Sequence, residues 1–132
     1  MVEAYLVAEC QKGRVLGPFP SHPVAPLQIS RFGVIPKRSQ PGKWRLILDL
    51  SFPEDSSVNA GISKEYCSLR YPSLDMAITQ ILQAGQNAQL SKLDIKDAYR
   101  IIQVHPADWG LLGMQRQGQF YVDQDDERYI HE

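Results

Sequence analysis

The sequence predicts an α+β domain, in which helices and strands are mixed without the regular βαβ rhythm of a parallel sheet. Apolar residues recur with helical spacing in some segments and alternate with polar residues in others, and Gly- and Pro-rich stretches separate these segments. The 132 residues, of which 43% are hydrophobic and 22% charged, are enough for one folded domain with a modest core.

The first thirty residues are predicted to form a short helix and an extended strap. Val2, Tyr5 and Leu6 have helical spacing, which favours a helix over residues 2–10. Residues 13–30 contain several glycines and prolines, which interrupt regular structure. We therefore expect this stretch to be extended and pinned by its prolines.

A β-hairpin is predicted next. Residues 32–36 have the composition of a strand, and residues 39–42, Ser-Gln-Pro-Gly, have turn chemistry. From Lys43 to Leu50 the side chains alternate, so that one face of a second strand is apolar and the other carries Arg45. The two strands and the turn together predict the hairpin.

The predicted hairpin gathers cations, although the formal net charge of the chain is only −1. Residues 31–45 contain no Asp or Glu, whereas Lys37, Arg38, Lys43 and Arg45 surround the turn, which indicates a local anion site. A triphosphate suits such a ribbon, because several donors bind it at once and the arginine fork matches phosphate oxygens. The alternative is a solvated hairpin tip whose charge protects the strand edge.

The second half of the chain is predicted to alternate loops with short elements. Residues 51–72 are mostly loop, Ser73 caps a helix that ends at Gly85, and residues 88–95 have the pattern of a buried strand. The remaining predicted elements are helical turns at 96–100 and 106–110, then strands at 111–116 and 119–122 joined at Gln117-Gly118.

The sequence argues against a cysteine-based metal site, a secretory signal and a membrane-spanning segment. Cys10 and Cys67 lie far apart without metal-ligand spacing, so both are expected to be reduced thiols. Residues 1–9 lack the pattern of a secretory signal, and no apolar run approaches the roughly 20 residues needed to span a bilayer. We expect an intracellular chain, cytoplasmic or nuclear, with no membrane partner.

Outside the hairpin, Asp94 is the first residue that could take part in metal binding or catalysis. It ends an apolar stretch, where a carboxylate is costly unless it binds a cation or caps a helix. A carboxylate at that point could bind Mg²⁺, which prefers hard oxygen ligands and shares them with substrate phosphates. Asp97 follows three residues later and could cap the next helical turn. The alternative is that Asp94 itself is only a capping residue.

Two further side chains have alternative interpretations. Tyr99 could place its ring against the sugar of a bound nucleotide, or it could pack in the core. His105 precedes Pro106 and is interpreted as a turn or capping residue.

The stretch from Tyr121 to Asp126 resembles the paired-aspartate Y-x-D-D hairpin of polymerases, but Gln124 stands where the second acid is needed. We therefore expect a solvated acidic tail there.

Taken together, these segments resemble a reverse transcriptase, most closely those of the DIRS-like retrotransposons that carry a tyrosine recombinase. The resemblance is carried by motifs such as Pro41-Gly-Lys-Trp-Arg-Leu-Ile-Leu-Asp-Leu-Ser51 and Leu93-Asp-Ile-Lys-Asp-Ala-Tyr99. The complete ordered series occupies residues 13–19, 30–37, 40–51, 57–59, 67–71, 90–100, 104–106, 111–114 and 118–123. Each motif is of moderate specificity, and their order makes the resemblance specific.

The resemblance implies a partial polymerase right hand, with a fingers β-hairpin, the first part of the palm sheet and flanking short helices. It implies that Asp94 is the first catalytic aspartate and binds Mg²⁺, with the Ile95 carbonyl completing the metal site. Template–primer nucleic acid and a deoxynucleoside triphosphate are the implied partners. The oligomeric state is left open.

The resemblance also implies a set of nucleotide-binding residues. Two backbone amides would hold the triphosphate, an aromatic gate would reject a ribose 2′-hydroxyl, and fingers cations would contact the phosphates. In this sequence the amides belong to Asp97 and Ala98, the gate is Tyr99, and the cations are Arg45 with Lys37 or Arg38.

The chain departs from this family after Asp123. The family continues into a Pro-Phe-Gly segment, a helix and the paired aspartates, whereas this sequence continues as an acidic stretch. We therefore expect residues 1–123 to be a truncated reverse transcriptase domain and residues 124–132 an unrelated acidic tail. Two-metal catalysis needs carboxylates from two strands, so we expect the chain to be inactive alone.

Two other interpretations stay open. One is a non-catalytic module, derived from a retroelement, that binds nucleic acid or a partner polymerase through the basic hairpin. The other is a chain that barely folds, because the edge of the predicted strand at 88–95 is left exposed and favours aggregation.

Overall fold

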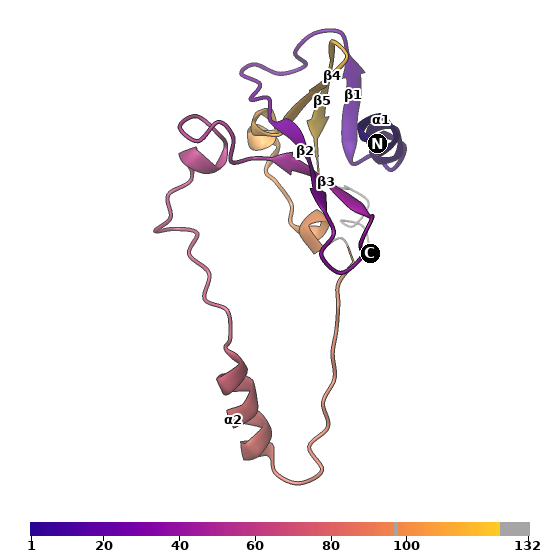
Figure 1. Ribbon diagram of the computed structural model, residues 1–132. Helices are drawn as coiled ribbons and strands as arrows, with labels where there is room; N and C mark the ends of the chain where they lie inside the picture. Colours follow the sequence, from indigo (N-terminus) through magenta and orange to yellow (C-terminus); the bar gives the residue numbers. More distant parts are fainter. Residues whose placement is uncertain (97, 125–132) are drawn as a thin grey trace. The chain divides into compact units, whose positions relative to one another are not determined.

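The computed structural model describes residues 1–96 and 98–124, with only the backbone of Tyr99 and Ile101, and the chain falls into two compact units (Figure 1). Unit 1 combines residues 1–61 with the described part of 97–132, and unit 2 consists of residues 62–96. Both helices and antiparallel sheets are present, so the predicted mixed α+β class is confirmed.

Unit 1 is built around a three-stranded antiparallel sheet in the order β1-β5-β4 (Figure 1). Its strands are β1 (Val15–Phe19), β4 (Gly113–Arg116) and β5 (Gln119–Asp123). A tight turn joins β4 to β5, with positive φ at Gln117 (51°) and Gly118 (75°). Two such residues in succession give the twist that a two-residue hairpin needs, so the predicted turn is confirmed.

Strand β1 lies within residues 13–30, which were predicted to be extended, although no strand was assigned there. Val15 pairs with Asp123 and Leu16 with Val122, and the register shifts before Phe19 pairs with Phe120. Pro18 is compatible with this strand because β1 lies at the edge of the sheet, where one side needs no hydrogen bonds. Pro18 is therefore accommodated in the strand, within the stretch where the register shifts.

Helix α1 (Val2–Gln11) packs beside β1 and closes the small core (Figure 1). Leu6, Val15 and Met114 form the buried cluster, with Met114 at 0% exposure. Burial of such side chains supplies most of the stabilisation available to a domain of this size. The helix predicted at residues 2–10 is confirmed.

The predicted hairpin consists of β2 (Arg31–Pro36) and β3 (Trp44–Asp49), which pair along their whole length. Its turn is closed by the Lys37 amide, which donates to the Lys43 carbonyl at 2.8 Å. At its other end Phe32 and Leu48 pack against the core. The hairpin is therefore fixed at its base, whereas Arg38 and Lys43 at its basic tip are exposed.

The rest of the strap, after β1, approaches β4 closely. The Gly113 amide donates to the Gln28 carbonyl at 3.0 Å, and the Ser30 amide donates to the Gly113 carbonyl at 2.9 Å. A Cβ at Gly113 would lie 2.5 Å from the Gln28 carbonyl oxygen, so only glycine allows this approach.

Short 3₁₀ helices complete unit 1: η1 (Asn59–Gly61), η2 (Ala98–Ile101) and η3 (Pro106–Leu111). The His105 side chain caps η3, because its Nδ1 accepts a hydrogen bond from the Ala107 amide at 3.2 Å. The capping role predicted for His105 is confirmed.

Unit 2 contains one helix, α2 (Leu74–Ala84). The Ser73 hydroxyl accepts a hydrogen bond from the Met76 amide at 3.2 Å, and Gly85 ends the helix with φ 80°, as predicted. The strand predicted at residues 88–95 is wrong: this stretch is irregular, and Leu93 is 92% exposed. A strand forms only with a partner, and within the described residues none pairs with this stretch.

Candidate functional site

A cleft of about 540 Å³ lies in unit 1 between α1, β3, η2 and the end of β5. Its walls are mostly aliphatic, and its polar groups come from a phenol, two guanidinium groups, a carboxylate and an amide. The lining residues are Tyr5, Arg45, Ile47, Leu48, Leu50, Arg100, Ile102, Val104, Leu112, Asp123 and Gln124.

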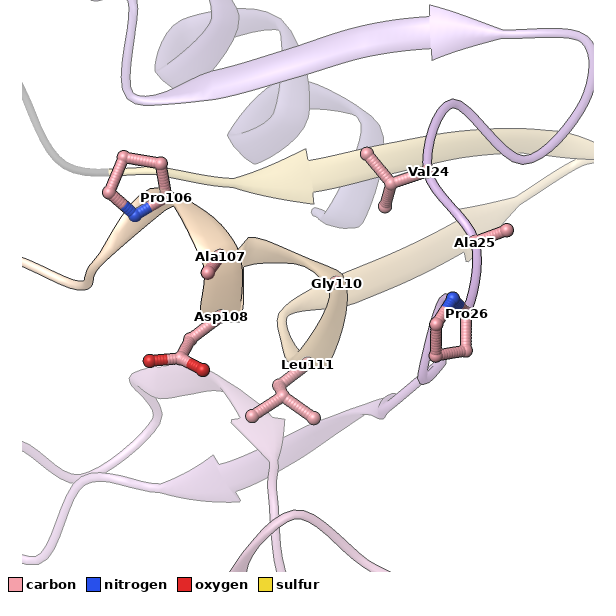
Figure 2. A pocket seen from close by; sticks show the side chains of 8 residues that line it. All are labelled: Val24, Ala25, Pro26, Pro106, Ala107, Asp108, Gly110 and Leu111. Atoms are coloured by element: carbon pink, nitrogen blue, oxygen red, sulfur yellow. The ribbon is translucent and has the colours of Figure 1, made fainter.

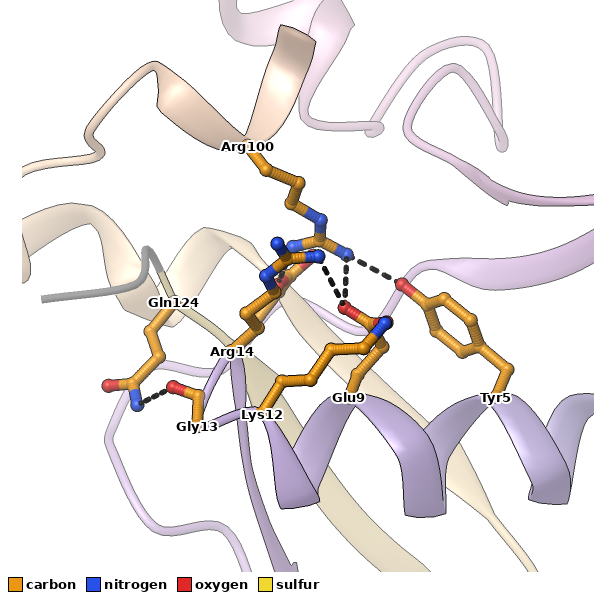
Figure 3. Close-up of polar contacts among 8 residues, drawn as sticks. Tyr5, Glu9, Lys12, Gly13, Arg14, Arg100 and Gln124 are labelled. Atoms are coloured by element: carbon orange, nitrogen blue, oxygen red, sulfur yellow. Dashed lines mark hydrogen bonds and ion pairs between the residues drawn. The ribbon is translucent and has the colours of Figure 1, made fainter. Parts of the chain in front are cut away.

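Tyr5, Arg100 and Asp123 line the cleft and belong to a larger polar set, which also contains Glu9, Lys12 and Arg14 (Figure 3). We call these six residues the Arg100 cluster. Arg100 is its centre. One Nη donates to the Asp123 carboxylate on β5, and the other donates to the Tyr5 hydroxyl on α1 at 2.7 Å. The same Nη lies 3.8 Å from Oε2 of Glu9. Arg100 therefore links η2 to both α1 and β5.

Glu9 is buried, with 6% of the residue exposed. A buried carboxylate is costly unless cations and hydrogen bonds compensate it. Lys12 donates to its Oε1 at 2.7 Å, and Nη1 of Arg14 lies 3.7 Å from its Oε2 (Figure 3). With Arg100, three cations surround this one acid, and they offset its charge although Oε2 accepts no hydrogen bond from the described residues.

The environment of the cluster shifts two pKa values. Burial raises the pKa of Tyr5, so its phenol stays protonated. For Arg100, burial alone would lower the pKa, but Asp123, Tyr5 and Glu9 together more than offset this, and the pKa is raised. At neutral pH the cluster therefore contains a neutral phenol and a permanent guanidinium cation.

The predicted hairpin cations are exposed or half-buried, and one of them reaches the cleft. Arg45 lines the cleft, whereas Lys37, Arg38 and Lys43 lie at the turn. Within residues 1–96 and 98–124, none of these four side chains forms an ion pair with an acid. Their charge is left available for an anionic ligand.

Arg31 differs from the other basic residues of the hairpin. Its Nη2 lies 3.0 Å from the Asp49 carboxylate across the strand pair, and its guanidinium stacks 3.4 Å from the centre of the Phe52 ring. Because these two contacts already occupy it, Arg31 is a structural residue of the hairpin base.

The other predicted site residues are divided between the two units. Ala98 and Tyr99 lie in η2, within unit 1, the unit that also contains Arg45. Asp94 and Ile95 belong to unit 2, and both are exposed. Asp97 lies outside the described residues. The structure thus brings the hairpin and the η2 turn into one unit.

The predicted Mg²⁺ site is not formed by the described residues alone. Asp94 offers a single carboxylate, and no three His, Cys, Asp or Glu side chains cluster within residues 1–96 and 98–124. A two-ion site needs several hard oxygen ligands around both ions. The described residues alone therefore do not supply the ligands of such a site.

The Arg100 cluster was not predicted from the sequence. Asp123 was expected as the last residue of the domain, before the acidic tail, and no contact was predicted for it. Only 17% of its side chain is exposed, and it pairs with Arg100. Gln124 also belongs to the folded unit, because its side chain donates to the Gly13 carbonyl at 2.9 Å. The one available signal was Arg100 itself, a charged residue directly after the Asp-Ala-Tyr motif.

A second, smaller cavity of about 240 Å³ lies between the strap and η3 (Figure 2). It is lined by aliphatic and backbone groups with one carboxylate, that of Asp108. None of the residues predicted to bind nucleotide lines it, so it gives no support to that function.

Comparison with known proteins identifies no relative. No family model matches the chain, and no curated protein or solved structure matches it significantly. Among the described residues, no helix combines the length and apolar character that a membrane span requires.

Proposed function

We propose that this chain is the fingers and first palm segment of a reverse transcriptase-like polymerase, an RNA-directed DNA polymerase, and that its cleft binds the incoming deoxynucleoside triphosphate. One observation carries the proposal: Arg45 of β3 and Arg100 of η2 line the same cleft. The hairpin and the Asp-Ala-Tyr sequence are the two segments that the sequence resemblance assigns to the triphosphate. Arg45 belongs to the hairpin and Arg100 directly follows the Asp-Ala-Tyr sequence, so their place in one cleft supports that assignment.

The chemistry of the cleft suits a nucleotide. Arg45 is exposed and forms no ion pair within the described residues, so its guanidinium can grip phosphate oxygens. Ile47, Leu48 and Leu112 supply an apolar surface on which a base or sugar can pack. A nucleotide could therefore place its phosphates against Arg45 and its base or sugar against these aliphatic side chains.

The proposal is tested by the binding of a fluorescently labelled deoxynucleoside triphosphate to the whole chain. Arg45→Ala removes a charge-assisted contact and should weaken binding by about tenfold or more. The matched control is Arg70→Ala, which removes an exposed arginine of unit 2 and should leave binding unchanged. Absence of binding by the unmodified chain, or equal effects of the two variants, would contradict the proposal.

The hairpin tip favours a second candidate function, in which the chain is a non-catalytic module that binds nucleic acid. Lys37, Arg38 and Lys43 surround the turn without acidic partners in the described structure, and Trp44 beside them is 55% exposed. Cations next to an exposed aromatic ring suit a phosphate backbone and stacked bases.

Binding to a labelled RNA–DNA duplex distinguishes the two functions. A nucleic-acid module should bind the duplex with an affinity that falls steeply with salt, and the double variant Lys37→Ala/Lys43→Ala should flatten that dependence. Duplex binding without triphosphate binding would favour this second function over the first. Triphosphate binding that depends on Arg45 would favour the polymerase origin.

A further inference from the structure

We propose that Arg100 is a positioning residue of the cleft, which fixes the η2 turn against α1 and β5. The inference rests on the proposed function, because it assigns Arg100 a part in triphosphate binding. Arg100 lines the cleft from η2, and its guanidinium contacts Tyr5, Glu9 and Asp123.

The η2 turn needs such an anchor because of its place in the chain. It lies where the chain returns to unit 1 after residues 62–96, which form a unit of their own. Of the η2 side chains that the structure describes, Ala98 is exposed and Arg100 makes the polar contacts to the core. Among the described side chains of η2, Arg100 is therefore the one that anchors the turn to the core.

The contacts of Arg100 indicate positioning rather than charge compensation. Lys12 and Arg14 already lie 2.7 Å and 3.7 Å from the Glu9 carboxylate, so Arg100 is not needed merely to neutralise it. The contacts that distinguish Arg100 are those to Asp123 and Tyr5, which come from different elements. A planar fork can reach both at fixed angles, whereas a lysine ammonium is a single point charge.

The test combines triphosphate binding with hydrogen exchange of the backbone amides at residues 98–102. Arg100→Lys keeps the charge but loses the fork, Arg100→Met removes both, and Tyr5→Phe removes one contact without changing charge. Arg116→Met is the matched control, because its pair with Glu3 at 3.8 Å is exposed and away from the cleft. All variants are measured at a temperature at which circular dichroism shows them folded, so that lost stability alone leaves the Kd unchanged.

Both Arg100 variants should bind the labelled triphosphate about tenfold more weakly, and Tyr5→Phe about threefold. Exchange at residues 98–102 should accelerate in the Arg100 variants, with Arg116→Met unchanged in both measurements. If Arg100→Lys binds as tightly as the unmodified chain, Arg100 acts only as a charge and the inference is wrong. Unchanged binding by Arg100→Met overturns it too. Failure of the unmodified chain to bind overturns the proposed function together with the inference.

Discussion

Replacing Met114 with alanine should destabilise unit 1 strongly, because this side chain is the centre of its core. Met114 is 0% exposed and packs with Leu6 and Val15. Deletion of its Cγ, Sδ and Cε leaves a cavity, and such substitutions cost about 2–5 kcal/mol. The surrounding Tyr5 and Tyr121 are only partly buried and can relax into the space. We therefore expect a loss of about 2–3 kcal/mol, a large part of the roughly 5–15 kcal/mol typical of a domain.

Urea unfolding followed by tryptophan fluorescence measures this loss, since Trp44 and Trp109 both lie in unit 1. The matched control is Met76→Ala, which deletes the same atoms from an α2 side chain that is 56% exposed. This control should change the free energy of unfolding by no more than about 0.5 kcal/mol. Equal shifts in the unfolding midpoint for the two methionine variants would refute the assignment of the core.

Gly17, the two cysteines and Tyr5 each have surroundings that set a further measurable property of the chain. Gly17→Ala should destabilise the sheet by more than about 1 kcal/mol in the same urea assay, because φ is 133° and a Cβ would lie 2.8 Å from the Phe120 carbonyl oxygen. A thiol reagent should modify exposed Cys67 before Cys10, whose pKa is raised by burial; equal rates in a mass-spectrometric time course would contradict this. Tyr5 has a pKa raised by burial above its ordinary value of 10.0, so its stabilising effect is complete below that pH and lost as pH rises through the higher value. The stability difference between the unmodified chain and Tyr5→Phe should therefore be constant at neutral pH and shrink above about pH 10, and a constant difference in alkaline urea titrations would argue against it.

Elements set by local chemistry could be predicted from the sequence. Ser73 and Gly85 delimit α2 as expected, because capping and helix termination depend on residues a few positions apart. The Gln117-Gly118 turn and the hairpin of β2 and β3 follow in the same way from turn residues and alternation. Each of these signals is complete within a short stretch of chain.

Elements that depend on distant partners could not be predicted in this way. β1 is a strand because β5, about a hundred residues later, supplies its hydrogen bonds, and the prolines around it concealed that pairing. The apolar stretch at 88–95 has the composition of a strand, but it is irregular because no strand among the described residues pairs with it. The Arg100 cluster joins Glu9, Arg100 and Asp123, whose proximity no local pattern encodes.

The way in which unit 1 is assembled from two stretches of chain has a practical consequence. Its first stretch supplies α1, β1 and the hairpin, and its second supplies η2, η3, β4 and β5, while residues 62–96 connect them. A single protease cut within that connection should leave two fragments held together by β1–β5 pairing and by the bonds from Arg100 to Tyr5. The two halves could then be expressed separately and mixed, so that their reassociation reports directly on the contacts between them.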